Sequence, residues 1–137
     1  MTAAEAYAPV LPLEVRVLAD DETCPDLPII EAGGRAWAVA WPGVGAHLRS
    51  MHRVSLQPDG NTVPLRHPME SVYYVLEGAA VATDLDLRQD HKLSAGSMIL
   101  IDPGTRYVLR ATEAGAEIVG GPCPPDPGMY VHINGGQ

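Results

Sequence analysis

Turn-forming residues divide the chain into short apolar runs, and this spacing limits the folds that the sequence can adopt. The 137 residues include 14 glycines and 13 prolines, which lie between runs rich in β-branched, aromatic and aliphatic side chains. Glycine and proline disfavour helix interiors, so no long helix fits between them. Short strands joined by tight turns do fit, and the sequence therefore predicts an all-β fold.

Alternation of apolar and polar side chains predicts where the strands lie. A period of two residues is typical of a strand with one buried face, and residues 50–57 show it clearly. This pattern, together with apolar runs bounded by turns, predicts strands at 14–18, 35–41, 50–57, 72–77, 79–87, 97–101, 106–110 and 117–119. Gly78 is expected to connect two of these strands as a hairpin.

The chain is expected to form a single domain over 1–137, with an arm at 1–12 and a proline- and glycine-rich tail at 121–137. Because proline cannot donate to a strand ladder, we expect neither helix nor central strand in residues 120–128. The tail would then lay residues 129–133 along a sheet edge. Open edges and two terminal segments also favour exchange with a second subunit, so we expect a homodimer.

Charge and cysteine content exclude several classes of protein. The net charge of −8 argues against nucleic acid and anionic membranes as partners, because both require a positive patch. Cys24 and Cys123 lie far apart without a CxxC partner, so the sequence indicates neither a disulfide framework nor a cysteine zinc site. Residues 1–12 lack a signal-peptide pattern, and no stretch has the length and apolarity of a membrane span. We therefore expect a cytoplasmic protein.

Two turn-bounded segments are similar in spacing to the two motifs of the cupin superfamily. The matching glycine, histidine and proline positions are Gly60, His67, Gly78, Gly96, Pro103 and Gly104. The resemblance covers residues 50–120 and implies a cupin-type double-stranded β-helix, a jelly-roll barrel. The run Glu-Ser-Val-Tyr-Tyr-Val and the proline-rich tail also resemble the ectoine synthase branch, which uses a tyrosine near its metal. The fold alone does not imply one function, because cupins host many activities.

The resemblance also implies which positions would hold a metal, and most of them are changed in this chain. The usual cupin ligands are three histidines and a glutamate, and their positions hold Leu65, His67, Ser71 and Tyr107. A transition metal needs about three good ligands, and one histidine does not supply them. We therefore favour no cofactor. The alternative is an iron, manganese or zinc ion bound by His67 with Glu70, His52 or Tyr107, and Glu70 joins only if a bulge shifts its strand.

Strand alternation and the cupin comparison place one set of side chains inside the barrel. Its members are His67, Tyr107, Tyr73, Ser71, Leu65 and Leu109. His52 and Arg53 point to opposite faces of their strand, so one of them faces the cavity, and the sequence leaves open which one. Arg53 in the cavity would imply a carboxylate ligand, whereas His52 would add a second imidazole.

This lining suits a small, partly apolar molecule that is held by a few hydrogen bonds. We predict that His67 is a general acid or base, because imidazole titrates near neutrality, and that Tyr107 donates to developing negative charge. The predicted substrate contacts are Tyr73, Ser71, Leu65, Arg53 and Leu109. The leading hypothesis is an enzyme of the lyase, isomerase or cyclase type. The alternatives are a metal-dependent cupin such as a dioxygenase and a non-catalytic ligand-binding cupin.

Overall fold

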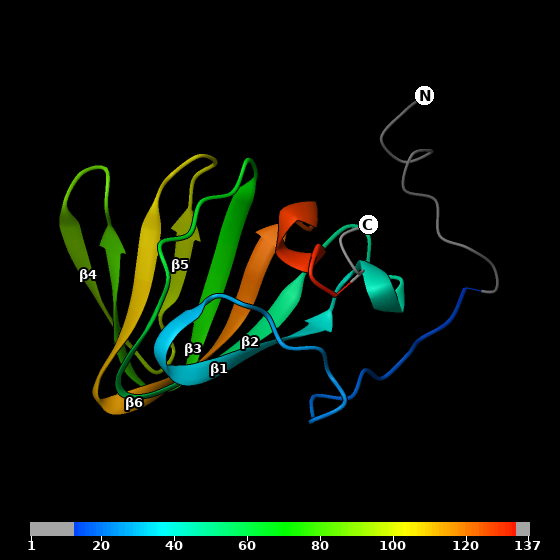
Figure 1. Ribbon diagram of the computed structural model, residues 1–137, viewed down its shortest axis with the longest axis horizontal. Helices are drawn as coiled ribbons and strands as arrows, with labels where there is room; N and C mark the ends of the chain where they lie inside the picture. The colour runs from blue at the N-terminus through cyan, green and yellow to red at the C-terminus, as the bar shows by residue number, and fades with distance from the viewer. Residues whose placement is uncertain (1–12, 134–137) are drawn as a thin grey trace.

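One antiparallel β-sheet, bent over on itself, makes up most of the fold (Figure 1). The computed structural model describes residues 13–133. Its strands are β1 (Ile30–Ala40), β2 (Met51–Thr62), β3 (Glu70–Asp84), β4 (Gln89–Ser94), β5 (Met98–Ile101) and β6 (Tyr107–Cys123). The sheet order is β1-β2-β6-β3-β4, and β5 pairs with β3 beside β4. The all-β prediction is confirmed.

Two glycines face each other where β3 and β6 bend. Gly78 and Gly115 have φ values of +80° and +72°, and a Cβ on Gly78 would lie 2.0 Å from the Gly115 carbonyl oxygen. Only glycine permits this close approach. The pairing of β3 with β6 shifts register on both sides of Gly78, but the strand continues from Glu70 to Asp84. The predicted hairpin at Gly78 is therefore wrong, because the glycine bends a continuous strand.

The same bend explains why the sequence predicts two strands where β6 is continuous. Residues 106–110 and 117–119 were assigned to separate strands by their apolar runs, but both fall within β6, apart from Arg106. A long strand that bends at a glycine contributes to both halves of the barrel. Central β2, β6 and β3 line the core with Val54, Leu56, Tyr73, Val75, Leu109 and Ile118, none of them more than 3% exposed.

Residues 14–18 do not form the predicted strand. They pair with no strand within residues 13–133, and the side chains of Val15 and Val17 are 97% and 96% exposed. Alternation of side chains is insufficient here, because a strand also needs a neighbour for its backbone hydrogen bonds. The predicted arm, residues 1–12, lies outside the described part of the chain.

The end of β6 differs from the prediction that residues 120–128 contain no central strand. β6 continues to Cys123. Gly120 pairs with His52 of β2 and with Tyr73 of β3, so that prediction is wrong at Gly120, whereas residues 121–123 pair with β3. Gly120 and Gly121 have φ values of +152° and +155°, which favour glycine. Pro122 takes part through its carbonyl oxygen, which accepts hydrogen bonds from the Ser50 N–H at 3.2 Å and the Ser50 hydroxyl at 2.6 Å. Because this contact uses the carbonyl group of Pro122, the lack of an N–H group on proline does not prevent it.

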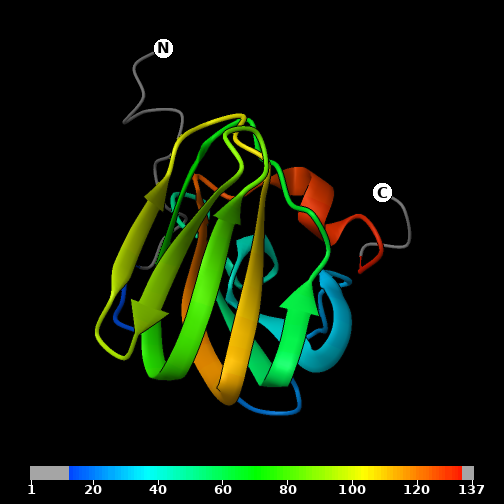
Figure 2. The same cartoon turned by 90° about the vertical axis from the view of Figure 1, so that its left-hand side faces the viewer.

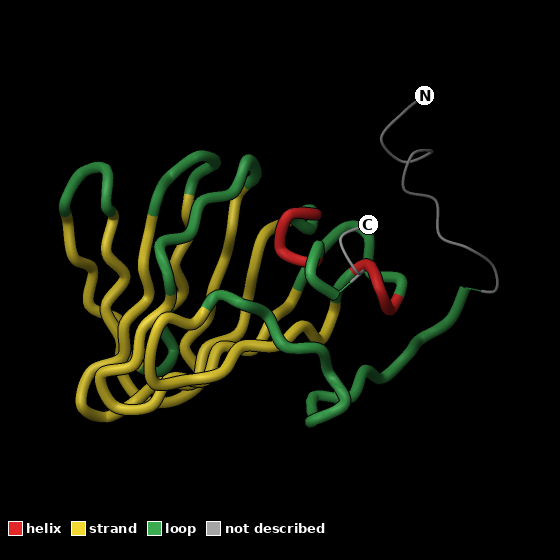
Figure 3. Tube along the Cα trace, viewed as in Figure 1, coloured by secondary structure: helices red, strands yellow, loops and turns green. Residues whose placement is uncertain are grey.

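The segment after β6 folds back over the barrel instead of adding to an edge. It forms a short 3₁₀ turn, η2 (Pro127–Tyr130), and a second such turn, η1 (Pro42–Val44), follows β1. The loops that connect β2 to β3, β3 to β4 and β5 to β6 gather at the edge opposite the bends (Figure 3). The turn η2 lies at the same end (Figure 2). No helix within residues 13–133 has the length and apolarity needed to cross a membrane.

Candidate active site

His67 lies in the loop between β2 and β3, at the open end of the barrel, and it is only 5% exposed. Backbone hydrogen bonds hold this loop beside the start of β6. The N–H of Leu65 donates to the carbonyl of Tyr107 at 2.8 Å, and the N–H of Tyr107 donates back to Leu65 at 2.9 Å. The Gly104 N–H donates to the His67 carbonyl at 2.8 Å. This backbone clamp brings the His67 ring to the Tyr107 side chain.

Three buried side chains form a line of hydrogen bonds. His67 Nε2 lies 2.9 Å from the Tyr107 hydroxyl, and the Tyr73 hydroxyl lies 2.8 Å from the same Tyr107 oxygen. Tyr73 comes from β3 and Tyr107 from β6, and they are 1% and 2% exposed. The two predicted acid–base residues, His67 and Tyr107, are therefore in direct contact, and Tyr73 adjoins them.

Asp126 completes this line from the segment that folds back after β6. Its Oδ2 lies 2.8 Å from His67 Nδ1, and its Oδ1 accepts a hydrogen bond from the Gly128 N–H at 3.0 Å, which caps η2. A carboxylate only accepts, so Nδ1 carries a proton, and in the neutral ring Nε2 then accepts from the Tyr107 hydroxyl. No sequence pattern indicated Asp126, because the tail was expected to lie along a sheet edge. We name the line Asp126–His67–Tyr107–Tyr73 the proton chain.

Burial makes the phenols of this site harder to ionise than a free tyrosine. Burial raises the pKa of Tyr73 to about 12, against the opposing effect of its hydrogen bond with Tyr107. Burial, and then the neighbouring Tyr73, raises the pKa of Tyr107 well above its usual range. Tyr107 is therefore a donor in its resting state, and its phenolate is strongly disfavoured.

His52, and not Arg53, faces the barrel interior. His52 is 0% exposed, and its Nε2 lies 2.6 Å from the hydroxyl of Tyr130 in η2. Its Nδ1 is buried and has no hydrogen-bond partner among residues 13–133. Burial, and then the nearby His67, lowers the pKa of His52 to about 4, so this imidazole is neutral at neutral pH. Arg53 points to the outer face, where it forms ion pairs with Asp20 and Glu117.

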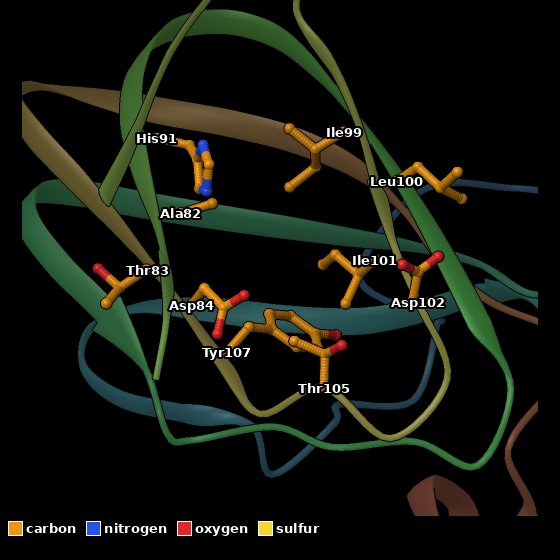
Figure 4. Close-up of a pocket in the computed structure, with 10 residues that line it drawn as sticks. All are labelled: Ala82, Thr83, Asp84, His91, Ile99, Leu100, Ile101, Asp102, Thr105 and Tyr107. Atoms are coloured by element: carbon orange, nitrogen blue, oxygen red, sulfur yellow. The ribbon is translucent and has the colours of Figure 1, made fainter. Parts of the chain in front are cut away.

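A pocket of about 250 Å³ lies between β3, β4 and β5 and reaches the proton chain at Tyr107 (Figure 4). Its lining residues are Ala82, Thr83, Asp84, His91, Ile99, Leu100, Ile101, Asp102, Thr105 and Tyr107. We name it the Tyr107 pocket, because Tyr107 belongs to both the lining and the proton chain. His91 is exposed and also lines this pocket.

The other predicted contacts are divided between the interior and the outside. Ser71 is 1% exposed, and its hydroxyl has no hydrogen-bond partner in the described part of the chain. Leu65 and Leu109 are buried in the apolar core, and neither lines the Tyr107 pocket. Glu70 is exposed at the start of β3. The structure thus brings His67, Tyr107 and Tyr73 together and leaves Arg53 and Glu70 outside.

Comparison with known proteins agrees with this architecture. A family model described as the cupin domain matches residues 52–119. The chain belongs to the cupin superfamily. No curated protein shows a significant sequence match to it.

Solved cupin structures share the fold at low sequence identity. KdgF from Halomonas sp. has a TM-score of 0.66 and 18% identity over 85% of this chain and 99% of that chain. The polyketide cyclase RemF from Streptomyces resistomycificus has a TM-score of 0.64 and 20% identity over 89% of this chain and 94% of that chain. A predicted oxalate decarboxylase from Thermotoga maritima has a TM-score of 0.65 and 18% identity over 80% and 99% of the two chains. These findings do not show the similarity to ectoine synthases.

The residues of this cupin do not fit the metal centre that the superfamily commonly holds. At the usual ligand positions, only His67 offers an imidazole, and both of its nitrogens are engaged by Asp126 and Tyr107. Within residues 13–133, no three histidine, cysteine, aspartate or glutamate side chains gather closely enough to hold a metal ion. The donor set is therefore unlike a site for iron, manganese or zinc. We derive no chemical step through a metal.

Proposed function

We propose that this cupin is a small-molecule enzyme of the lyase, isomerase or cyclase type, which moves a proton between its substrate and the proton chain. One observation supports this above all: hydrogen bonds run from a pocket wall, Tyr107, through His67 to a carboxylate, Asp126. A base that is oriented by a third group is the usual arrangement for acid–base catalysis.

The substrate would lie in the Tyr107 pocket, next to the Tyr107 phenol. As the Tyr107 oxygen takes a proton from the substrate, its own proton passes to His67 Nε2 over the 2.9 Å hydrogen bond. The Asp126 carboxylate, 2.8 Å from Nδ1, stabilises the imidazolium that forms. Because the raised pKa of Tyr107 disfavours a free phenolate, the two transfers occur together. Return of the proton to another atom of the substrate completes the reaction.

Reactions of this kind need no change of oxidation state. Isomerisation returns the proton to a different carbon, elimination returns it to a leaving hydroxyl group, and cyclisation moves it from an attacking group to an oxygen. Each needs one group that exchanges protons and one donor near developing negative charge. RemF, a fold neighbour, is described as a polyketide cyclase, which is one reaction of this class.

Exchange of carbon-bound hydrogen for deuterium tests the proposal without knowledge of the natural substrate. A panel of small ketones and amino ketones in D₂O is followed by NMR for exchange beside the carbonyl. The wild-type protein should catalyse exchange in at least one member, and Tyr107→Phe should slow it by about 10²- to 10⁴-fold. Tyr74→Phe is a matched control, because Tyr74 is 37% exposed on the outer face of β3.

Two outcomes contradict the proposal. If Tyr107→Phe, with a melting transition that shows it is folded, exchanges hydrogen at the wild-type rate, the proton chain has no catalytic role. If the wild-type protein exchanges no compound but retains a ligand unchanged through purification, the non-catalytic binding cupin is the better description.

We also propose that the protein forms a homodimer. Leu13, Val15 and Val17 expose alternate apolar side chains on an unpaired segment, and they are 66%, 97% and 96% exposed. Leu76 of β3 and Met98 and Leu100 of β5 are also exposed, at 41%, 67% and 61%. The chain thus carries both a strand-like segment without a neighbour and a sheet with an open edge at β5. A second copy of the chain would supply a neighbouring strand for the segment and cover the open edge of the sheet.

Light scattering tests this assembly. We expect twice the monomer mass for the wild-type protein, and a shift toward the monomer for the double variant Val15→Asp with Val17→Asp. A monomeric mass for the wild-type protein at micromolar concentration contradicts the dimer.

A further inference from the structure

The charge of the Tyr107 pocket distinguishes among the molecules that it would accept. Its ionisable side chains are the carboxylates of Asp84 and Asp102 and the imidazole of His91, with Tyr107 at the inner wall. None of the described residues that line it is a lysine or an arginine. An anionic ligand would therefore meet two carboxylates with no guanidinium or ammonium group in the wall.

Asp84 has an oxygen that is available to a ligand. Its Oδ1 accepts hydrogen bonds from the N–H groups of Asp86 and Leu87, both at 2.9 Å, and these bonds hold the turn between β3 and β4. Its Oδ2 has no hydrogen bond within the described range, and the residue is half-buried in the pocket wall. Figure 4 shows Asp84 beside Thr83 and the Tyr107 ring. The turn thus fixes one oxygen and leaves the other free.

The rest of the wall is mostly apolar, apart from Thr83 and Thr105, and the pocket is small. Ala82, Ile99 and Ile101 contribute methyl and methylene groups, and the ring of Tyr107 contributes an aromatic surface. A volume of about 250 Å³ holds about eight heavy atoms if each takes about 30 Å³, the volume of a water molecule in the liquid. The pocket therefore suits a compact molecule with an apolar body.

We propose that the substrate of this pocket is a small amine: a positively charged nitrogen on an apolar or unsaturated body. The ammonium group would donate to Asp84 Oδ2, while the body packs on Ile99 and Ile101. The Asp102 carboxylate, on the other side of the pocket (Figure 4), adds to the negative charge around the ligand. The face of the Tyr107 ring also attracts a cation. This inference rests on the proposed function in one respect, because it takes the Tyr107 pocket as the place where the substrate reacts.

Three probes that share one ring but differ in charge test the inference: benzylamine, benzyl alcohol and benzoate. Binding is followed by NMR titration of ¹⁵N-labelled full-length protein. We expect benzylamine to bind most tightly, benzyl alcohol more weakly, and benzoate not at all. The variant Asp84→Asn should weaken benzylamine binding about tenfold, since a charged hydrogen bond is worth about that factor, and Asp102→Asn should weaken it less. Neither variant should change the binding of benzyl alcohol. Asparagine keeps the Oδ1 acceptor that holds the turn.

Asp59→Asn is the matched control, because Asp59 lies in an exposed bend of β2, apart from the pocket lining. The inference is overturned if benzoate binds as tightly as benzylamine, or if both pocket variants bind benzylamine like the wild type. Tyr107→Phe separates this inference from the proposed function, because phenylalanine keeps the aromatic wall. If Tyr107→Phe loses hydrogen exchange but the protein does not prefer benzylamine to the other two probes, only the proposed substrate class is contradicted. If the protein prefers benzylamine but Tyr107→Phe exchanges hydrogen at the wild-type rate, only the catalytic role of the proton chain is contradicted.

Discussion

Two buried histidines at the same end of the barrel differ in their hydrogen-bond partners. His67 and His52 are 5% and 0% exposed, and each lies within hydrogen-bond distance of a tyrosine hydroxyl. His67 also has a carboxylate, Asp126, at its second nitrogen, whereas the second nitrogen of His52 has no partner within residues 13–133. A buried imidazole can accept a proton only where a partner stabilises the charge. The residue type and the degree of burial of a side chain are therefore insufficient to identify a candidate acid–base group.

The largest expected effect separates the two histidines by their role in turnover. His67→Gln should slow hydrogen exchange by about 10²- to 10⁴-fold, because it removes the group that receives the proton in the proposed reaction. His52→Gln should change the rate far less, because His52 is neutral and lies outside the proton chain. His47→Ala is the control, since His47 is an exposed loop residue. Equal losses in both glutamine variants would break the comparison.

The second effect concerns stability and pH. Burial, and then the nearby His67, lowers the pKa of His52 from 6.5 in the unfolded chain to about 4 in the folded protein. The unfolded state therefore binds more protons between these values, and stability falls as pH falls. The contribution of His52 is complete above about pH 6.5, and about 3 kcal/mol is lost by pH 4.

Urea unfolding from pH 7 to pH 4 measures this loss. His52→Gln should give a flatter dependence, because glutamine can still bond to Tyr130 but does not titrate. The same dependence on pH in His52→Gln and in the wild type would show that other groups cause the acid sensitivity.

A smaller effect is expected when the partner of His67 loses its charge. Asp126→Asn keeps an oxygen at the His67 Nδ1 proton but no longer stabilises the imidazolium. A charge-assisted hydrogen bond is worth about 1.5–3 kcal/mol, so kcat should fall about 10- to 100-fold with little change in KM. A rise in KM with kcat unchanged would mean that Asp126 only holds η2 over the barrel.

The smallest expected effect concerns Glu70, the carboxylate of the metal-dependent alternative. Glu70 is exposed and makes no side-chain hydrogen bond in the described part of the chain, so Glu70→Gln should change stability by less than about 0.5 kcal/mol and leave exchange unaffected. A large loss of activity, together with loss of iron, manganese or zinc measured by elemental analysis, would favour the metal-dependent enzyme.

The fold was predictable because its signals are local. Period-two alternation and turn residues act over a few positions, so they located β2, β5 and the beginning of β3. The predictions were wrong where one local sequence pattern is compatible with two different structures. A glycine between apolar runs predicts a hairpin, but Gly78 instead bends one strand against Gly115. Likewise, Gly120, Gly121 and Pro122 look like an end of the sheet, but they continue β6.

The pairing of His67 with Tyr107 was predictable because both lie in matched cupin motifs that meet at the barrel mouth. The contact between His67 and Asp126 was not, because it spans 59 residues and depends on the turn that folds back after β6. The choice between His52 and Arg53 also required the structure, since a shift of one residue in register exchanges the two faces of a strand.

The sequence by itself determined an all-β cupin barrel and the two side chains that meet in it, because periodicity, turn residues and motif spacing are properties of the chain. Only the tertiary structure decided which histidine has a carboxylate partner, which face β2 turns inward, and that Tyr107 joins the proton chain to a pocket. Those properties depend on contacts between segments far apart in the chain, and no local pattern encodes them.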